Sequence, residues 1–223
     1  ADGRGRALYL FPTKALAHDQ LAGLSDLAAA AEFPLSAAGF VFHPASPRFV
    51  SMERARTLSR VLDGTGVLRV GVFTGNDADS IARTAEGARM DCAQVYDPLV
   101  AQRLDGRIRV ITAYRVSGAE DMEALSRAPA RGLLLLDRFD AGLYGGTGKP
   151  FDWEALRGFP YIERAIVAGG IDAANLGRLL ALIRPYGIDV SSGIEDAPGI
   201  KSKEKIMNLF NTLREVYDEI HAR

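Results

Sequence analysis

Eight short apolar runs, separated by amphipathic segments, constrain the fold of this chain more than any other feature. The runs lie at residues 7–11, 37–42, 68–73, 92–96, 108–113, 132–137, 165–168 and 187–190. Each run is apolar almost continuously rather than at alternate positions, which is typical of parallel strands buried on both faces. Parallel neighbours in a sheet need long crossover connections, so the pattern predicts repeated strand–helix units.

The segments between the runs carry the spacing of helices. In residues 173–183, leucines recur on one face, with Asp172 placed to cap the helix and Pro185 placed to end it. Eight such units in 223 residues predict an α/β fold of the (βα)8 or TIM barrel type, with eight parallel strands inside an outer ring of helices. An open doubly wound sheet is the alternative, but the glycine fingerprint that it needs after an early strand is absent.

Charge and cysteine content exclude several kinds of partner. The chain has 27 Lys and Arg against 28 Asp and Glu, a net charge of −1, which predicts neither nucleic-acid nor membrane binding. No apolar run approaches the roughly 20 residues of a membrane span, and residues 1–6 lack the apolar core of a signal peptide. Cys92 is the single cysteine, which fits a reducing environment, so we expect a cytoplasmic protein.

The sixth apolar run ends in a carboxylate, at the carboxyl end of its predicted strand. In this fold, active sites lie at the carboxyl ends of the strands, and the run at 133–136 is four leucines followed by Asp137. A buried carboxyl group among apolar neighbours has a raised pKa and can donate a proton near neutral pH. The alternative is an Asp that only accepts hydrogen bonds from loop amides.

The seventh and eighth runs end in small residues suited to an anion. Gly169, Gly170, Ser191 and Ser192 let backbone N–H groups approach a phosphate, helped by a helix N-terminus. We therefore expect a phosphorylated small molecule or free phosphate as ligand, with two tight turns as the alternative. The glycine-rich segment 145–149 does not have the Walker A pattern and suggests a lid instead.

The second run is followed by a cationic loop. Arg48 comes after two prolines and has the geometry to clamp a carboxylate or phosphate, or else it is a solvated loop residue. The three histidines do not have the spacing of metal ligands: His43 is a loop residue, and His18 and His221 fall on helix surfaces. We expect no metal.

Six segments together resemble phosphoribosylanthranilate isomerase, in the order and spacing of that family, over residues 37 to 223. They are GFVFHPASPRFV at 39–50, LRVGVF at 68–73, LLLLD at 133–137, GGTGKPFDW at 145–153, VAGGIDAANL at 167–176 and GIDVSSGIEDAPGIK at 187–201.

The resemblance implies an isomerase of the aldose–ketose type, formally an intramolecular oxidoreductase, in tryptophan biosynthesis. That enzyme performs an Amadori rearrangement of N-(5′-phosphoribosyl)anthranilate without metal or cofactor: an acid protonates the ribose ring oxygen and a base removes the C2′ proton. Asp137 matches the family's acid, and Arg48 matches the Arg at the anthranilate end. The family's phosphate-site segments match Gly169, Gly170, Ser191 and Ser192.

The chain departs from the family where the base should be. The Cys that serves as base on the family's first strand falls on or near Leu10, which accepts no proton. Tyr96 and Asp97 replace the family's His-Gly after strand 4, and Thr112 replaces its Lys in strand 5. Tyr96 and Asp97 are the nearby candidates for a replacement base, whereas Cys92 is expected deep in the barrel. Loss of a positioned base lowers a rate by about 10²–10⁴-fold.

The first unit resembles a different protein. Residues 5–24, GRALYLFPTKALAHDQLAGL, are similar to the motif Ia segment of DExH/DEAD-type helicases, although no Walker A or Asp-Glu box follows. We therefore predict one domain over 1–223 that is a chimera, with an atypical first βα unit at 1–35 and isomerase-like units at 36–223. An irregular splice at 32–35 would favour a homodimer over a monomer by exposing barrel surface.

Three functions follow from these observations. The chain is a phosphoribosylanthranilate isomerase of low activity, or an inactive barrel scaffold that keeps the phosphate site. It is otherwise a paralogue that acts on another phosphoribosyl amine, with Tyr96, Asp97 and Thr112 reshaping the pocket.

Overall fold

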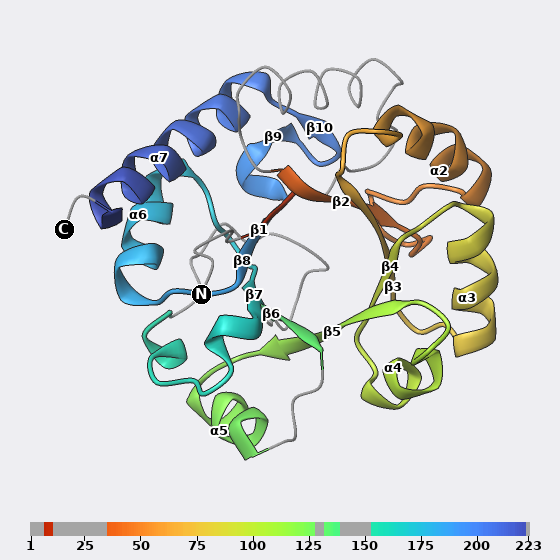
Figure 1. Cartoon of the computed structure of the whole chain (residues 1–223), viewed down its shortest axis with the longest axis horizontal. Coiled ribbons are helices and arrows are strands. Elements are labelled where there is room, and N and C mark those ends of the chain that lie inside the picture. Colours follow the sequence, from red (N-terminus) through yellow and green to blue (C-terminus); the bar gives the residue numbers. More distant parts are fainter. Residues whose placement is uncertain (1–6, 11–34, 128–131, 139–152, 222–223) are drawn as a thin grey trace.

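A parallel sheet forms the centre of the molecule. The computed structural model describes residues 7–10, 35–127, 132–138 and 153–221. Eight strands pair in parallel in the order of the chain, and the first also pairs with the last, in a closed barrel (Figure 1). They are β1 Ala7–Leu10, β2 Leu35–Val41, β3 Leu68–Phe73, β4 Cys92–Val95, β5 Arg109–Val116, β6 Leu133–Arg138, β7 Ala165–Val167 and β8 Gly187–Val190. The prediction of an α/β fold built on a parallel sheet is confirmed.

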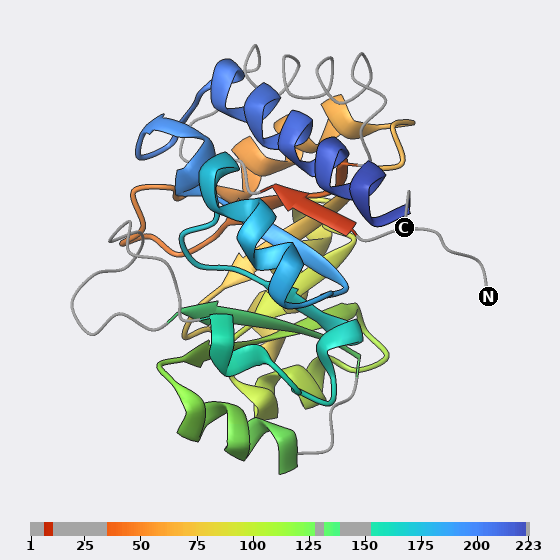
Figure 2. The same cartoon turned by 90° about the vertical axis from the view of Figure 1, so that its left-hand side faces the viewer.

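Helices surround the sheet, as Figure 1 shows. They are α2 Met52–Ser59, α3 Ala78–Gly87, α4 Pro98–Leu104, α5 Ala119–Arg127, α6 Ala173–Leu182 and α7 Lys203–His221, with short 3-10 helices at Arg60–Leu62, Trp153–Leu156, Ile162–Arg164 and Ser192–Ile194. The helices α6 and α7 pack side by side (Figure 2). A small antiparallel pair follows β8, formed by β9 Glu195–Ala197 and β10 Ile200–Lys201. Residues 145–149 and His18 lie outside the described residues.

Local sequence sets the ends of α6. The Asp172 side chain accepts a hydrogen bond from the Asn175 N–H, and the Asn175 side chain accepts one from the Asp172 N–H, which together form a capping box. The helix ends at Leu182, three residues before Pro185. The predicted cap at Asp172 and the predicted stop before Pro185 are both confirmed.

The sheet has a separate apolar core on each of its faces. Between the sheet and the helices lies a large cluster that includes Leu134, Leu136, Ile188 and Val190. Inside the barrel lies a smaller cluster, formed by Ala37, Val70, Val72, Cys92, Ile111, Ala113, Leu135, Ile166 and Ala168. Consecutive strand residues therefore alternate between the two cores, which assigns each strand residue to the interior or to the helix side.

The pairing of β1 with β2 is irregular. Leu8 pairs with Leu35, but Tyr9 pairs with Ala37, so the register shifts and Ser36 is the extra residue on β2. From Ala37 onward, β2 pairs with β3 without a break. The irregularity lies next to residues 32–35, where the sequence predicted an irregular splice.

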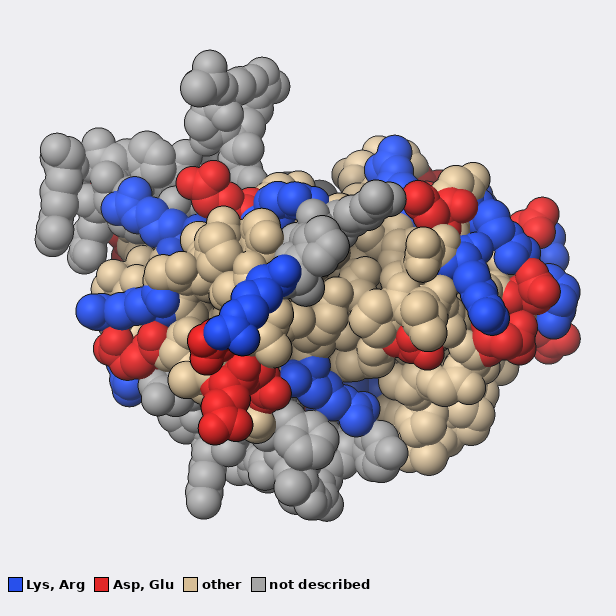
Figure 3. Space-filling view, turned by 90° about the horizontal axis from the view of Figure 1, so that it is seen from below, with Lys and Arg blue, Asp and Glu red and all other residues tan. Residues whose placement is uncertain are grey.

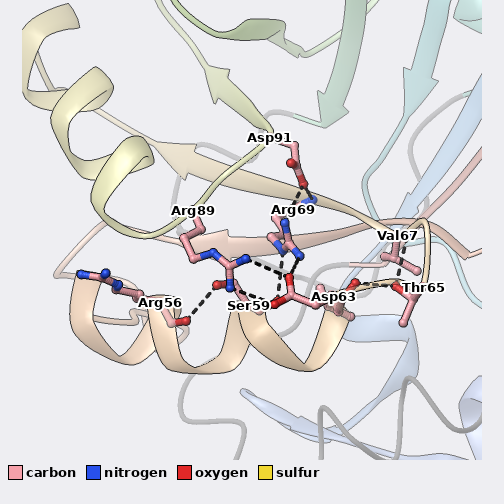
Figure 4. A network of polar contacts seen from close by, with 9 residues as sticks. Arg56, Ser59, Asp63, Thr65, Val67, Arg69, Arg89 and Asp91 are labelled. Carbon is pink, nitrogen blue, oxygen red and sulfur yellow. Dashed lines mark hydrogen bonds and ion pairs between the residues drawn. The ribbon is translucent and has the colours of Figure 1, made fainter.

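An ion-pair network, which we call the amino-end network, joins the amino ends of β3 and β4 (Figure 4). It consists of Asp63, Arg69, Arg89 and Asp91. Asp63 pairs with Arg69 and, at 3.0 Å, with Arg89, while the Arg69 N–H donates to Asp91 at 2.8 Å. Arg89 has a φ of 62°, unusual for a non-glycine residue, at the turn into β4. In barrels of this kind, contacts at the amino end serve stability rather than chemistry.

One face of the molecule shows mixed charge. On the face drawn in Figure 3, Lys and Arg side chains lie among Asp and Glu side chains instead of gathering in one basic area. Within the described part of the chain, no helix is long and apolar enough to cross a bilayer.

Candidate functional site

A layer of polar side chains lies inside the carboxyl end of the barrel. Gln94, between Ala93 and Val95 of the outer cluster, points inward, and Tyr96 packs against the interior cluster. Asp137 follows Leu135 by two residues on β6 and shares its interior face. Asp189 lies between Ile188 and Val190 and is interior by the same alternation.

Within this layer, Tyr96 connects Gln94 to Asp137 by hydrogen bonds. The Gln94 amide donates to the Tyr96 hydroxyl at 3.4 Å, and that hydroxyl donates to Asp137 Oδ2 at 3.4 Å. Burial raises the pKa of Tyr96, and the nearby Asp137 and Asp189 raise it further. Tyr96 is therefore a neutral donor to the half-buried Asp137, at the strand end where the sequence placed the acid. Arg115, paired with Asp137 in the β5–β6 register, lies with its guanidinium carbon 5.1 Å from the centroid of the Tyr96 ring.

The loops after β7 and β8 touch each other. A Cβ added at Gly193 would lie 2.0 Å from the Ile171 carbonyl oxygen, so only glycine permits this approach. Gly169 and Gly170 have φ values of 92° and 72°, which also favour glycine. Their N–H groups donate to no acceptor among the described residues.

The helix α6 begins beside these glycines. The Asn175 side chain donates to the Gly170 carbonyl at 2.8 Å and so fixes the loop. Ser191 and Ser192 lie in the neighbouring loop, where Ser192 starts a 3-10 helix. The four residues predicted to bind phosphate, Gly169, Gly170, Ser191 and Ser192, therefore belong to two loops in contact. The helix N-terminus beside them, and the two glycine amides that lack an acceptor within the described residues, are of the kind that suits an anion.

Arg48 belongs to a buried cluster of charges, which we call the carboxyl-end cluster and which consists of Arg48, Glu195 and Lys201. Two bonds join Arg48 to Glu195: Nη2 to Oε2 at 2.7 Å and Nε to Oε1 at 3.3 Å. Lys201 Nζ lies 3.2 Å from Glu195 Oε1 and donates to the Ser191 carbonyl at 2.9 Å. The side chains are 13%, 3% and 3% exposed. Arg48 is thus held in a fixed position rather than solvated.

Burial lowers the pKa of Lys201 to about 8, although the charge of Glu195 acts in the opposite direction. Lys201 connects Glu195 to the carbonyl of Ser191, so the carboxyl-end cluster also holds the loop after β8. The three charges of the carboxyl-end cluster are therefore connected to the loop that contains Ser191 and Ser192.

A cavity of about 470 Å³ opens beside the polar layer, above the ends of β3, β4 and β5. The residues that line it are His43, Thr74, Gly75, Tyr96, Asp97, Ala113, Tyr114 and Arg115. His43, which the sequence assigned to an ordinary loop, is therefore part of a cavity wall.

The structure also places Asp97, which was a candidate for the missing base, and Cys92 and Thr112, which were not. The Asp97 carboxylate caps α4, where it accepts from the N–H of Leu99 at 2.8 Å. Cys92 is buried in the interior cluster, and desolvation raises its pKa to about 11, so the thiol stays protonated, as its deep position predicted. Thr112 lies between two interior residues, so alternation turns it toward the helices and away from the pocket that it was expected to reshape.

Asp189, Glu195 and Lys201 are site residues that sequence reasoning missed. The signal for Asp189 was present, because it interrupts an apolar strand two residues before Ser191. Its inward direction follows once Ile188 and Val190 are assigned to the helix side. Glu195 and Lys201 are separated from Arg48 by about 150 positions, and only the fold brings them together.

Comparisons with known proteins agree with one another. The N-(5'phosphoribosyl)anthranilate (PRA) isomerase family model matches residues 16–212, and so begins upstream of residue 37, where the sequence motifs start. The N-(5'-phosphoribosyl)anthranilate isomerase of Rubrobacter xylanophilus is 40% identical over 190 residues, which are 83% of this chain and 92% of that protein.

Solved structures give the same result. The phosphoribosyl anthranilate isomerase of Thermotoga maritima superposes with a TM-score of 0.79 at 30% identity, over 94% of this chain and 98% of that one. A second such structure, in complex with reduced 1-(o-carboxyphenylamino)-1-deoxyribulose 5-phosphate, has a TM-score of 0.75 at 27% identity, over 94% and 98% of the two chains. Family match, identity and superposition cover most of the chain, which therefore belongs to the N-(5′-phosphoribosyl)anthranilate isomerase family.

Proposed function

We propose that this protein catalyses the Amadori rearrangement of N-(5′-phosphoribosyl)anthranilate, a step of tryptophan biosynthesis. One observation carries the proposal: in a chain of this family, an interior carboxyl group and two touching loops, whose glycine amides lack an acceptor among the described residues, all lie at the carboxyl end of one parallel sheet. In barrels of this kind, that end holds the active site.

Each role is assigned from the position of its residue. Asp137 is the acid that protonates the ribose ring oxygen, and the neutral hydroxyl of Tyr96 orients it. Arg48, fixed by Glu195, binds the carboxylate of the anthranilate group. The substrate phosphate binds to the amides of Gly169, Gly170, Ser191 and Ser192. A solved relative in complex with a reduced deoxyribulose 5-phosphate compound supports a phosphorylated ligand of this size.

We propose that residues 1–223 form one complete (βα)8 barrel with eight strands and an outer ring of helices. The pairing of β1 with both β2 and β8 supports this. We propose further that residues 1–35 are an atypical, helicase-like unit joined to an isomerase-like remainder at 36–223, as in a chimera. The register shift at Ser36, next to the junction, supports this boundary.

We place the protein in the cytoplasm, as befits a biosynthetic enzyme with a single buried thiol. It acts as a monomer or homodimer, and the Thermotoga maritima relative is described as dimeric.

The test is turnover of N-(5′-phosphoribosyl)anthranilate by the purified protein, together with rescue of a tryptophan auxotroph that lacks this isomerase. We expect rescue by the wild type, and a loss of about 10²–10⁴-fold in kcat/KM for Asp137→Asn, because the ring oxygen then has no proton donor. Failure of the wild type in both assays, with a melting temperature that still rises in inorganic phosphate, would favour the inactive scaffold. Turnover of a different phosphoribosyl amine would favour the paralogue.

A further inference from the structure

Asp189 is a buried acid whose hydrogen bonding is incomplete. Its Oδ1 is buried and, among the residues that the structure describes, has no hydrogen-bond partner. A buried oxygen left without a partner destabilises a fold, and more strongly when it is charged. Such a group needs an explanation, and a role toward a ligand is one. Asp189 points into the barrel at the level of the polar layer, because Ile188 and Val190 face the helices.

Charged groups on several elements act on Asp189. Burial raises its pKa well above the usual value, and the carboxylate of Asp137 on β6 raises it further. Lys201 on β10 and Arg48 after β2 act in the opposite direction. Tyr96, the residue directly after β4, is also within electrostatic range of both carboxyl groups. Two carboxyl groups that interact in this way favour a state with one proton between them. When that proton lies on Asp137, Asp189 is the carboxylate, and its raised pKa makes it the stronger proton acceptor of the two.

The position of Asp189 relates it to the strand that carries the base in the family. β8 pairs with β1, and Asp189 pairs with Tyr9, one residue before Leu10. An acid on β8 therefore adjoins the strand that lacks its family's Cys. Two other groups are unsuited to act as this base. The Asp97 carboxylate caps a helix, and the Cys92 thiol stays protonated because burial raises its pKa to about 11.

We propose that Asp189 removes the C2′ proton of the substrate, in place of the missing base on the first strand. This inference rests on the proposed isomerase function. Asp137 gives its proton to the ring oxygen as the C1′–O bond breaks, which leaves a protonated imine between C1′ and nitrogen. The Asp189 carboxylate then takes the C2′ proton. The electron pair of that C–H bond forms the C1′=C2′ double bond, and the imine π pair returns to nitrogen.

The rearrangement is completed without any reactant other than the substrate. The resulting enolamine gains a proton at C1′ and loses one from the C2′ hydroxyl, which gives the ketone and returns both carboxyl groups to their starting forms. Carbon C1′ is reduced and C2′ is oxidised within one molecule, so no external oxidant or reductant enters. In this scheme Asp137 on β6 is the acid and Asp189 on β8 is the base.

The first experiment compares turnover of N-(5′-phosphoribosyl)anthranilate by the wild type, Asp189→Asn and the matched control Asp63→Asn, which changes a carboxylate at the opposite end of the sheet. We expect Asp189→Asn to lower kcat by about 10²–10⁴-fold with little change in KM, and Asp63→Asn to leave both unchanged. Because Asp189→Asn keeps the size of a buried side chain whose Oδ1 has no partner among the described residues, its melting temperature should not fall.

The second experiment separates a catalytic base from a structural residue. In Asp189→Ala, added formate should restore part of kcat, and the restored rate should follow the ionised fraction of formate as pH rises. A structural role would give lower stability and no rescue by formate. Wild-type turnover with full kcat in Asp189→Asn would overturn this inference and leave the proposed function intact. Absence of wild-type turnover would overturn both, since Asp189 would then not replace the missing base.

Discussion

The two ends of the sheet contain similar charges in different surroundings. In the amino-end network, Asp63 joins two arginines while its side chain stays 47% exposed. In the carboxyl-end cluster, Glu195 joins Arg48 and Lys201 with a side chain only 3% exposed. Exposed ion pairs add little to stability, whereas a buried charge depends strongly on its partner. The difference teaches that the exposure of the ion pairs, and not their number, distinguishes the amino end of the sheet from the carboxyl end, where we propose that the chemistry occurs.

The largest effect on stability should come from Glu195→Gln. This change leaves Arg48 and Lys201 buried beside a neutral amide, and loss of one partner from a buried ion pair destabilises proteins by about 3–5 kcal/mol. Denaturant unfolding measures the change. Glu154→Gln is the matched control, because it makes the same substitution in a surface ion pair with Arg157 whose side chains are half exposed. Equal losses in the two variants would show that burial does not distinguish the two ends.

Local sequence predicted much of the architecture and part of the site. Continuous apolar runs located the strands, because both faces of a parallel strand are buried here. The cap at Asp172 and the position of Asp137 at a strand end were predicted for the same reason: each depends on residues close in sequence. The touching loops at Gly169 and Gly193 follow from small residues at two strand ends.

Other parts of the site depend on contacts across the barrel. Arg48 and Glu195 are 147 positions apart, so their pairing follows from the fold alone. Asp97 was considered as a base, yet the helix that begins directly after it uses its carboxylate as a cap. Asp189 was overlooked because its neighbours had to be assigned to the helix side before its inward direction became visible. Whether a polar group has a hydrogen-bond partner depends on the three-dimensional structure.

The next effect concerns the two loops at the carboxyl end that are proposed to bind the substrate phosphate. Gly193→Ala would place a Cβ 2.0 Å from the Ile171 carbonyl and push the two loops apart. A displacement of about 1 Å in a positioning group can reduce a rate by about 10²-fold, so we expect kcat/KM to fall by this order. Steady-state kinetics measures it, and the gain in melting temperature on adding inorganic phosphate should shrink in parallel. Gly106→Ala is the control, because a Cβ there meets no atom, although its φ of 77° strains any side chain. Unchanged kinetics in Gly193→Ala would place the anion site elsewhere.

A smaller effect is the pH dependence that the buried Lys201 imposes. Its pKa is about 8 in the folded chain and 10.5 ordinarily, so between these values the unfolded chain holds a proton that the native chain has released. Stability should therefore rise with pH from 8 to 10.5, by at most about 1.4 kcal/mol per pH unit. Cys92 acts in the opposite sense, because its raised pKa gives stability that is present below pH 9 and lost as pH passes about 11. Denaturant unfolding from pH 7 to 11 should show the rise diminished in Lys201→Met and steeper in Cys92→Ala. The same profile in the wild type and in Lys201→Met would contradict the lowered pKa.

The smallest effect should come from Asp63→Asn in the amino-end network. The Arg89 guanidinium, by its hydrogen bond, lowers the pKa of Asp63 below 3.8, so this carboxylate contributes stability above that pH and loses it as pH falls further. Because Asp63 is nearly half exposed, water and salt screen the interaction. We expect a slight fall in melting temperature at low ionic strength, none at about 1 M salt, and unchanged kcat. Differential scanning calorimetry at two salt concentrations makes the measurement. A fall as large as that of Glu195→Gln, or one that persists at high salt, would mean that Asp63 behaves as a buried charge and that the two ends of the sheet are held together in the same way.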